Sequence, residues 1–201
     1  MKNQTIKIIL ATIGAVGIVV LVYFDAYLPY RKAHAFITAL QNGQNVKSFD
    51  EFTVNFRRPL DMYSPIGQEE VVKYIANDIQ NTVFQVKDKN EPVAKALIAF
   101  IEPYINITDV NHTLPMAGMY TGMWKYYGNE EYFKKAEEYF LSIEKDNPNL
   151  PLSYYNLLAL YREQGDMEKT KEYAEKILKL WPQDTSVKSI LDNAIELKKS
   201  L

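Results

Sequence analysis

The sequence predicts an all-α protein that begins with a transmembrane helix, and three observations support this class. Residues 8–24 form an apolar run without a single charge. Elsewhere apolar side chains recur every three or four residues, the period of an amphipathic helix, and no convincing stretch alternates as a strand would. In addition, the last third of the chain repeats itself after 34 positions.

The composition limits the possible classes of function. The chain has 201 residues, with 23 Lys and Arg against 25 Asp and Glu, and no Cys. This near-neutral balance argues against a nucleic-acid partner, which would need a strongly basic face. The lack of Cys excludes a disulfide framework, a thiol nucleophile and a Cys-based zinc site. The length suffices for one modest domain and an appendage.

Residues 8–24 are predicted to span a lipid bilayer. Their 17 residues cover roughly 26 Å of a hydrocarbon layer about 30 Å thick, and Lys7 can snorkel to extend the span. A cleaved signal peptide is the alternative, because residues 33–35 have the small-x-small form of a cleavage site, although far from the apolar run. We favour a retained anchor. Three tyrosines at its end match an aromatic belt: Tyr23, Tyr27 and Tyr30.

The charges that flank the anchor are nearly balanced. Lys2 and Lys7 precede it, whereas Arg31 and Lys32, offset by Asp25, follow it. A short N-terminus that carries lysine favours the inside orientation. We therefore expect a short cytoplasmic N-terminus and an extracytoplasmic C-terminal domain.

Residues 25–116 are predicted to form a juxtamembrane and irregular helical region. Pro29 is expected to break the helix that leaves the membrane, and a short helix follows it. Ser48 and Glu51 then have the spacing of a capping box for a second helix, which Pro59 is expected to end.

Two longer helices are predicted next. Ser64 and Pro65 are expected to be the N-cap and first residue of one helix, Pro92 opens the other, and residues 87–90 form a surface turn between them. Their inner stripes contain Val72, Ile75, Ile79, Val83 and Val86, and then Ala94, Leu97, Ile98 and Ile101.

Residues 117–184 contain two copies of one pattern. Eight pairs of identical residues are separated by 34 positions, far more than chance would supply: Tyr120/Tyr154, Tyr127/Tyr161, Lys135/Lys169, Glu138/Glu172, Tyr139/Tyr173, Ile143/Ile177, Lys145/Lys179 and Pro148/Pro182. A fixed period of this length is typical of helical repeat proteins.

The two copies resemble tetratricopeptide repeats. The first has Tyr120, Met123, Trp124, Tyr127, Ala136, Phe140 and Pro148 at the characteristic positions, and the second has Tyr154, Leu157, Leu158, Tyr161, Thr170, Ala174 and Pro182. The resemblance implies an α-solenoid of antiparallel helix pairs. Residues 185–201 would then form a capping helix with a polar outer face.

The tetratricopeptide resemblance also implies a peptide-binding concave face, lined by the first helix of each pair. Asn156 would take the place of the asparagine that bonds the ligand backbone. The alternative is that these residues are ordinary solvent residues and that the groove is filled by the chain's own preceding helices. The predicted contact residues, called the groove residues below, are Thr121, Lys125, Tyr155, Asn156 and Arg162.

A second resemblance covers about residues 15–184. The run 49–70, with Ser64-Pro65-Ile66-Gly67, is similar to the extracytoplasmic tail of bacterial O-antigen ligase and polymerase family proteins. This implies a bacterial envelope protein linked to glycan export. The multi-span membrane core that carries catalysis in that family is absent here, so a detached tail or a non-catalytic relative is expected.

The sequence contains no recognisable catalytic constellation. His34 is expected in the juxtamembrane helix and His112 in a loop, both as solvated surface residues. Four glutamates are interpreted as parts of salt-bridged helix faces: Glu69, Glu70, Glu137 and Glu138. No phosphate-binding, dinucleotide-binding or nucleophile-elbow motif occurs. We expect no enzyme activity, no cofactor and no metal.

These observations favour a non-enzymatic, membrane-anchored adaptor that binds another membrane-associated protein at the extracytoplasmic face of a bacterial membrane. The first alternative is an accessory subunit of an O-antigen ligase-type or polymerase-type glycan assembly system. The second is direct glycan binding through some of the 15 tyrosines, although most of these are expected in the core.

Overall fold

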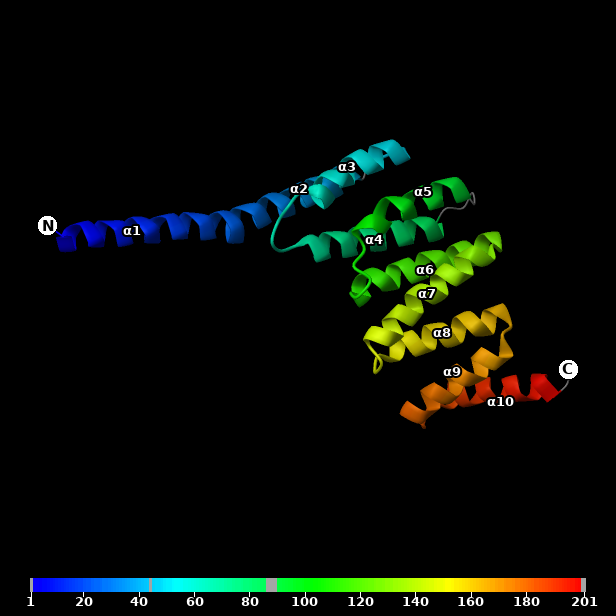
Figure 1. Cartoon of the computed structure of the whole chain (residues 1–201). Coiled ribbons are helices and arrows are strands. Elements are labelled where there is room, and N and C mark those ends of the chain that lie inside the picture. Colours follow the sequence, from blue (N-terminus) through cyan, green and yellow to red (C-terminus); the bar gives the residue numbers. More distant parts are fainter. Residues whose placement is uncertain (1, 44, 86–89, 200–201) are drawn as a thin grey trace. The chain divides into compact units, whose positions relative to one another are not determined.

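A computed structural model describes residues 2–43, 45–85 and 90–199, with the helices in the order drawn in Figure 1. These residues form helices and short connections, and none of the described segments is a strand. The predicted all-α class is therefore confirmed for them. The chain divides into two compact units, which we describe separately: Met1–Ile75 with Ala99–Tyr104, and Ala76–Ile98 with Ile105–Leu201.

The first unit begins with a helix whose apolar side chains are exposed. Helix α1 (Lys2–Leu21) continues through the π-helical segment η1 (Val22–Tyr27) into α2 (Leu28–Gly43). Within the described residues, the one helix long and apolar enough to cross a membrane is Gln4–Gly43, and none of its most apolar window is buried in the protein. The exposed residues include Ile8, Ile9, Leu10, Ile13, Val16, Ile18, Val19 and Leu21.

Pro29 does not break the helix, contrary to the prediction. The backbone widens into the π-helical turn just before it, where the Leu28 amide donates to the Tyr23 carbonyl five residues back. Because a proline has no amide hydrogen and its ring crowds the carbonyl four residues earlier, the wider turn accommodates Pro29 without ending the helix.

Helix α3 (Phe49–Asp61) packs against α2. Its predicted N-cap is confirmed, because the Glu51 amide donates to Ser48 Oγ at 3.2 Å, while the Glu51 carboxylate accepts from the Lys47 amide at 2.8 Å. Pro59 does not end this helix, which continues to Asp61. In the last turn a proline removes only one intrahelical bond, and its buried ring contributes to the core.

The next helix begins three residues later than predicted. Helix α4 spans Gln68–Gln85, so Ser64 and Pro65 are not its N-cap and first residue. Instead Ser64 Oγ donates to the Ile66 carbonyl at 2.7 Å, and Gly67 has φ of +87°, a conformation that favours glycine. Residues 63–67 therefore form a separate turn before α4.

Helix α5 spans Glu91–Ile101 and leads into the 3₁₀ turn η2 (Glu102–Tyr104). Helices α4 and α5 bury the apolar stripes that were predicted for them. The buried side chains are Val72, Ile75, Ile79, Val83, Ala94, Leu97, Ile98 and Ile101. Val86 and residues 87–89 of the predicted turn lie outside the described residues.

The second unit contains two helical hairpins and a final helix (Figure 1). Gly128 and Gly165 close the hairpins in the left-handed conformation, and Asn129 and Asp166 cap the helices that follow. The hairpin helices are α6 (Val110–Tyr127) with α7 (Glu130–Asp146), and α8 (Pro151–Gln164) with α9 (Met167–Leu180).

The 34-position correspondence holds where the second helix of each hairpin ends but shifts at the hairpin turns. Asn147 and Trp181 end α7 and α9 with nearly the same backbone angles, φ/ψ of −134/67° and −129/76°. The turn glycines, however, are 37 positions apart, because α8 extends one turn beyond the position at which α6 ends. The two hairpins thus correspond where their second helices end and differ at their turns.

Tyrosines fill the interior of these hairpins, as predicted. The rings of Tyr120 and Tyr139 stack with centroids 5.9 Å apart, and the rings at the positions 34 residues later, Tyr154 and Tyr173, lie 6.5 Å apart. The final helix α10 (Thr185–Lys199) buries Val187 and packs on α9.

Candidate functional site

The groove residues lie on α6 and α8, the first helices of the two hairpins. Thr121 and Lys125 share one face of α6, because residues four apart are neighbours on a helix. On α8, Tyr155 and Arg162 are seven residues apart and share a face, whereas Asn156 is turned from Tyr155 by about 100°. The groove residues of α8 therefore do not form one row.

One ion pair joins the two groups. Lys125 Nζ lies 2.6 Å from Glu163 Oε2, which connects α6 to α8 next to Arg162. Both side chains of the pair are more than a third exposed, so this contact contributes at most about 1 kcal/mol. Lys125 is neutralised by this pair, and the exposed cationic group at this end of α8 is then the guanidinium group of Arg162.

Two of the groove residues bond to their own helix. Thr121 Oγ1 donates to the Ala117 carbonyl at 2.8 Å, and Asn156 Nδ2 donates to the Leu152 carbonyl at 2.9 Å. Such bonds duplicate a carbonyl that the helix already satisfies. The Asn156 amide can therefore exchange this bond for one to a ligand backbone at small cost.

Tyr155 has a structural contact that the sequence did not indicate. Its hydroxyl donates to Asp184 Oδ2 at 2.5 Å, and its ring centroid lies 6.1 Å from that of Trp181. Asp184 also accepts from the Val187 amide at 2.9 Å at the start of α10. The Tyr155 hydrogen bond lowers the pKa of the Asp184 carboxyl, and the same bond raises the pKa of Tyr155.

Two glutamates of α7 connect it to the second hairpin, and we call these contacts the glutamate rungs. Glu137 accepts from the Tyr161 hydroxyl at 2.6 Å and from Lys169 Nζ at 2.5 Å. Glu144 accepts in the same way from the Tyr173 hydroxyl at 2.7 Å and from Lys176 Nζ at 3.2 Å. The two glutamates are seven residues apart, and so are the two lysines, so the rungs lie two turns apart.

Each lysine of the glutamate rungs also lies over an aromatic ring. Lys169 Nζ is 4.5 Å from the centroid of Tyr161, and Lys176 Nζ is 4.2 Å from that of Tyr173. A cation over the ring face is attracted by the negative face of the ring. A related set joins α5 to α7, where the Tyr132 hydroxyl donates to Glu91 at 2.5 Å.

The tyrosines of the glutamate rungs remain neutral at physiological pH. Burial is the main cause that raises the pKa of Tyr161 and Tyr173 well above the ordinary tyrosine value, and the hydrogen bonds to Glu137 and Glu144 add to it. A neutral phenol donates to a carboxylate, whereas a phenolate could not. The rungs are therefore contacts between helices and not activated nucleophiles.

Glu137 and Glu138 were predicted to lie on one solvated helix face, and this prediction is wrong for Glu137. The Glu137 side chain is 19% exposed and bridges two hairpins. Glu138 is 61% exposed and pairs with Lys135 on its own helix, as predicted. Consecutive helical residues point in directions about 100° apart, so one faces the neighbouring hairpin and the other faces solvent.

The prediction for His112 is wrong. This residue lies in the first turn of α6, not in a loop, and it is 1% exposed. Asp109 caps α6 from the preceding position, so the helix begins earlier than expected and turns position 112 inward. His34, by contrast, is exposed on α2 as predicted.

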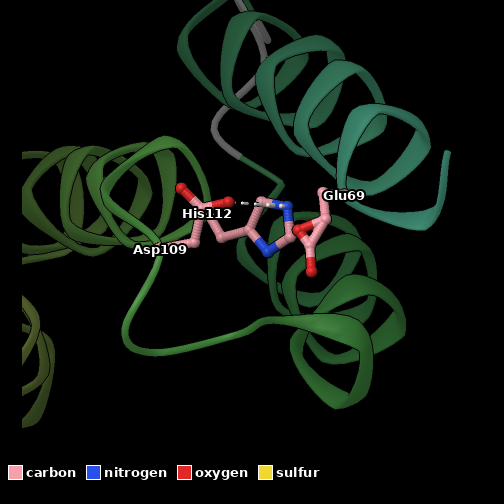
Figure 2. Close-up of side chains that lie close together, drawn as sticks. All are labelled: Glu69, Asp109 and His112. Atoms are coloured by element: carbon pink, nitrogen blue, oxygen red, sulfur yellow. Dashed lines mark ion pairs between the residues drawn. The ribbon is translucent and has the colours of Figure 1, made fainter. Parts of the chain in front are cut away.

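Figure 2 shows the His112 imidazole beside Asp109. The Asn106 amide donates to His112 Nδ1 at 3.2 Å, so this nitrogen acts as the acceptor, and Nε2 lies 3.8 Å from Asp109 Oδ2. Glu69, drawn in the same figure, is an exposed residue of the other unit. Within its own unit the imidazole and one carboxylate supply fewer ligands than the three or four of protein zinc sites.

A buried lysine lies at the exit of the apolar helix in the first unit. Lys32 is 1% exposed, and its ammonium group donates to the Met62 carbonyl at 2.7 Å and to Gln68 Oε1. These bonds tie α2 to the turn between α3 and α4. The sequence alone did not indicate them, because the bonding partners are 30 and 36 positions away.

Two clefts lie beside α2. The first, of about 300 Å³, is mainly apolar and is lined by Pro29, Lys32, Ala33, Phe36, Ile66, Gly67, Glu70, Val71 and Tyr74. The second, of about 330 Å³, is lined by Tyr30, Arg31, His34, Ala35, Thr38, Arg58 and Met62. The second cleft contains two arginines and no carboxylate, and we call it the arginine cleft.

Comparisons of the chain with protein-family models, with curated proteins and with solved structures find no match.

Proposed function

We propose that this protein is a non-enzymatic adaptor whose helical domain is anchored to a bacterial membrane and binds another protein at the extracytoplasmic face. The observation that carries the proposal is the exposure of the apolar residues in α1. Ile8 is 65% exposed and Ile18 63%, whereas Ile75 and Ile143 in the other helices are 1% exposed. Each apolar side chain in water costs about 1.5–3 kcal/mol relative to burial, so α1 needs an apolar surrounding. A lipid bilayer supplies one.

The two hairpins support an adaptor role. The 34-residue correspondence, the tyrosine pairs inside each hairpin and the glutamate rungs between hairpins favour repeat units of the tetratricopeptide type. Proteins of this class bind extended segments of a partner through the first helices. Asn156, half-buried on α8, and the exposed Arg162 have the chemistry for a ligand backbone amide and for an acidic or carbonyl group.

Anchoring is part of the proposed mechanism. A domain held at the membrane surface meets other membrane proteins at a raised effective concentration, as the second module of a linked pair does. Weak contacts in the groove then suffice for partner capture. Exposed polar groups of α8 can therefore form the contact surface without a deep pocket.

The groove assignment is tested with the full-length protein in native membranes. A photo-crosslinking amino acid in place of Tyr126, exposed on α6, captures a partner in the wild-type background. The double variant Asn156→Ala with Arg162→Ala is expected to reduce the captured protein at least fivefold, since each lost polar contact costs about 0.5–1.5 kcal/mol. Helix content, measured by circular dichroism, should be unchanged.

The matched control is Asn149→Ala with Lys134→Ala, which removes the same kinds of group from exposed positions outside α6 and α8. This control should capture the partner as the wild type does. Equal capture by both double variants would reject the groove. Identification of a multi-span glycan-assembly protein in the crosslinked band would favour the accessory-subunit form of the adaptor role.

A further inference from the structure

The arginine cleft is built by two helices that are distant in sequence. Arg31 lies in the first turn of α2 and Arg58 in the last turn of α3. Both line the same cleft of about 330 Å³, together with the His34 side chain. The packing of α3 on α2 therefore brings a second guanidinium group to the helix that leaves the bilayer.

Neither Arg31 nor Arg58 has an ion-pair partner in the part of the chain that the structure describes. Among the described residues, no carboxylate lies within 4 Å of either guanidinium group, and none lines the cleft. The neighbouring carboxylate at the end of α3, Asp61, accepts from the Tyr104 hydroxyl at 2.5 Å. Two guanidinium groups without an internal counter-charge make a site for an external anion.

The position of the cleft along the helix indicates where this anion comes from. The guanidinium carbon of Arg31 lies 5.6 Å from the ring centroid of Tyr27, so the side chain points back toward the apolar segment. Tyr27 is three residues beyond Phe24, the end of the apolar run, which is about 4.5 Å along the helix. The polar layer of one leaflet is roughly 5–8 Å thick, so the guanidinium group lies at headgroup depth.

We propose that the arginine cleft binds the phosphate group of an anionic phospholipid in the leaflet from which α2 emerges. This inference rests on the proposed function, because it requires α1 to span the bilayer. A guanidinium group presents two parallel donors that match two phosphate oxygens. Two such groups from α2 and α3 hold the lipid against both helices, so the lipid fixes the first unit to the membrane surface.

The test measures lipid selectivity of the full-length protein. The protein is titrated in detergent micelles with phosphatidylglycerol and phosphatidylcholine of identical acyl chains, and bound lipid is counted by native mass spectrometry. The wild type is expected to prefer phosphatidylglycerol. Arg58→Gln is expected to lower this preference by up to about fivefold, the upper value for one exposed charged contact.

Arg57→Gln is the matched control. Arg57 precedes Arg58 on α3, carries the same charge and lies 6.0 Å from the Phe100 ring, but does not line the cleft. It should keep the wild-type preference. Equal losses in the two variants, or no preference in the wild type, would overturn the proposal. If Arg58→Gln loses helix content, Arg31→Gln replaces it with the same expectation.

Two further measurements separate this proposal from others. Soluble glycerol phosphate at millimolar concentration should not displace phosphatidylglycerol, and full displacement would assign the cleft to a soluble phosphate and overturn the lipid assignment. Carbonate extraction of the native membranes should leave the protein in the membrane. Extraction into the supernatant would reject the anchor and the proposed function, whereas a retained protein without lipid preference rejects the arginine cleft alone.

Discussion

At the residue scale, the neutral tyrosines of the glutamate rungs make the stability of the second unit sensitive to alkaline pH. The folded state raises the pKa of Tyr161 and Tyr173 through burial and through their carboxylate partners. In an unfolded chain a tyrosine loses its proton near pH 10. The stability that comes from the neutral form is therefore complete below about pH 10 and is lost as the pH rises above it.

We expect Tyr161→Phe with Tyr173→Phe to lower the free energy of unfolding by about 2 kcal/mol at pH 7, since two buried hydrogen bonds are lost. The same variant should lose less stability than the wild type between pH 9 and pH 11. Denaturant unfolding of the full-length protein in detergent, followed by circular dichroism, measures both effects. Tyr126→Phe, at a position 41% exposed, is the control. A double variant that follows the alkaline decline of the wild type would contradict this account.

Burial of polar residues was the part of the molecule that the sequence predicted least well. His112 and Glu137 were predicted as surface residues and Lys32 only as a charge beside the anchor, yet Lys32 and His112 are buried and Glu137 is mostly so. The partners of Lys32 and Glu137 are 24 to 36 positions away, so a sequence window does not contain them. His112 was missed because the cap at Asp109, which starts α6 before it, was not predicted. The seven-residue spacing of two glutamates on one helix and two lysines on another was the one available signal for the glutamate rungs.

At the element scale, a capping side chain predicted where a helix begins better than a proline predicted where a helix ends. The predicted cap at Ser48 is present, whereas Pro29 and Pro59 lie inside continuous helical segments. A proline costs one hydrogen bond and a local clash. Near a helix end or in a widened turn this cost is small compared with the burial gained by continuing, so the helix does not stop.

The hairpin turn at Gly165 depends on the backbone conformation of one residue. Gly165 has φ of +84°, and a Cβ built there would meet no atom within 4 Å. The cost of a side chain at position 165 therefore comes only from the strain of the left-handed backbone conformation. Gly165→Ala should cost about 1 kcal/mol of unfolding free energy, and Gly165→Asn should cost less, because asparagine tolerates the left-handed conformation better. Urea midpoints in detergent give the order, and an alanine variant as stable as the wild type would contradict it.

At the scale of the whole molecule, the all-α class and the exposed apolar helix were predictable, whereas the meeting of α2 with α3 was not. The apolar run at residues 8–24 and the apolar side chains that recur every three or four residues are local patterns, and each predicts a helix without reference to the rest of the chain. The arginine cleft depends on the register between two helices joined by a separate segment, and no pattern within either helix specifies that register.

The proposed orientation of the chain in a membrane is open to direct measurement because the protein contains no cysteine. We expect Ser186→Cys to react with a membrane-impermeant maleimide in spheroplasts, and Gln4→Cys to react only after lysis. The reverse pattern would place the helical domain in the cytoplasm. If Gln4→Cys stays unlabelled after lysis and the protein has lost mass, the N-terminal segment is a cleaved signal.

The π-helical segment at Val22–Tyr27 absorbs one extra residue between the apolar helix α1 and α2. Such a turn holds one residue more than an ordinary helical turn, and each helical residue advances the azimuth by about 100°. Deleting one residue there would restore the regular winding. Because the wide turn absorbs the extra residue, Arg31 and the arginine cleft would keep their direction around the helix axis, whereas the same deletion in the regular part of α1 would turn them by about 100°.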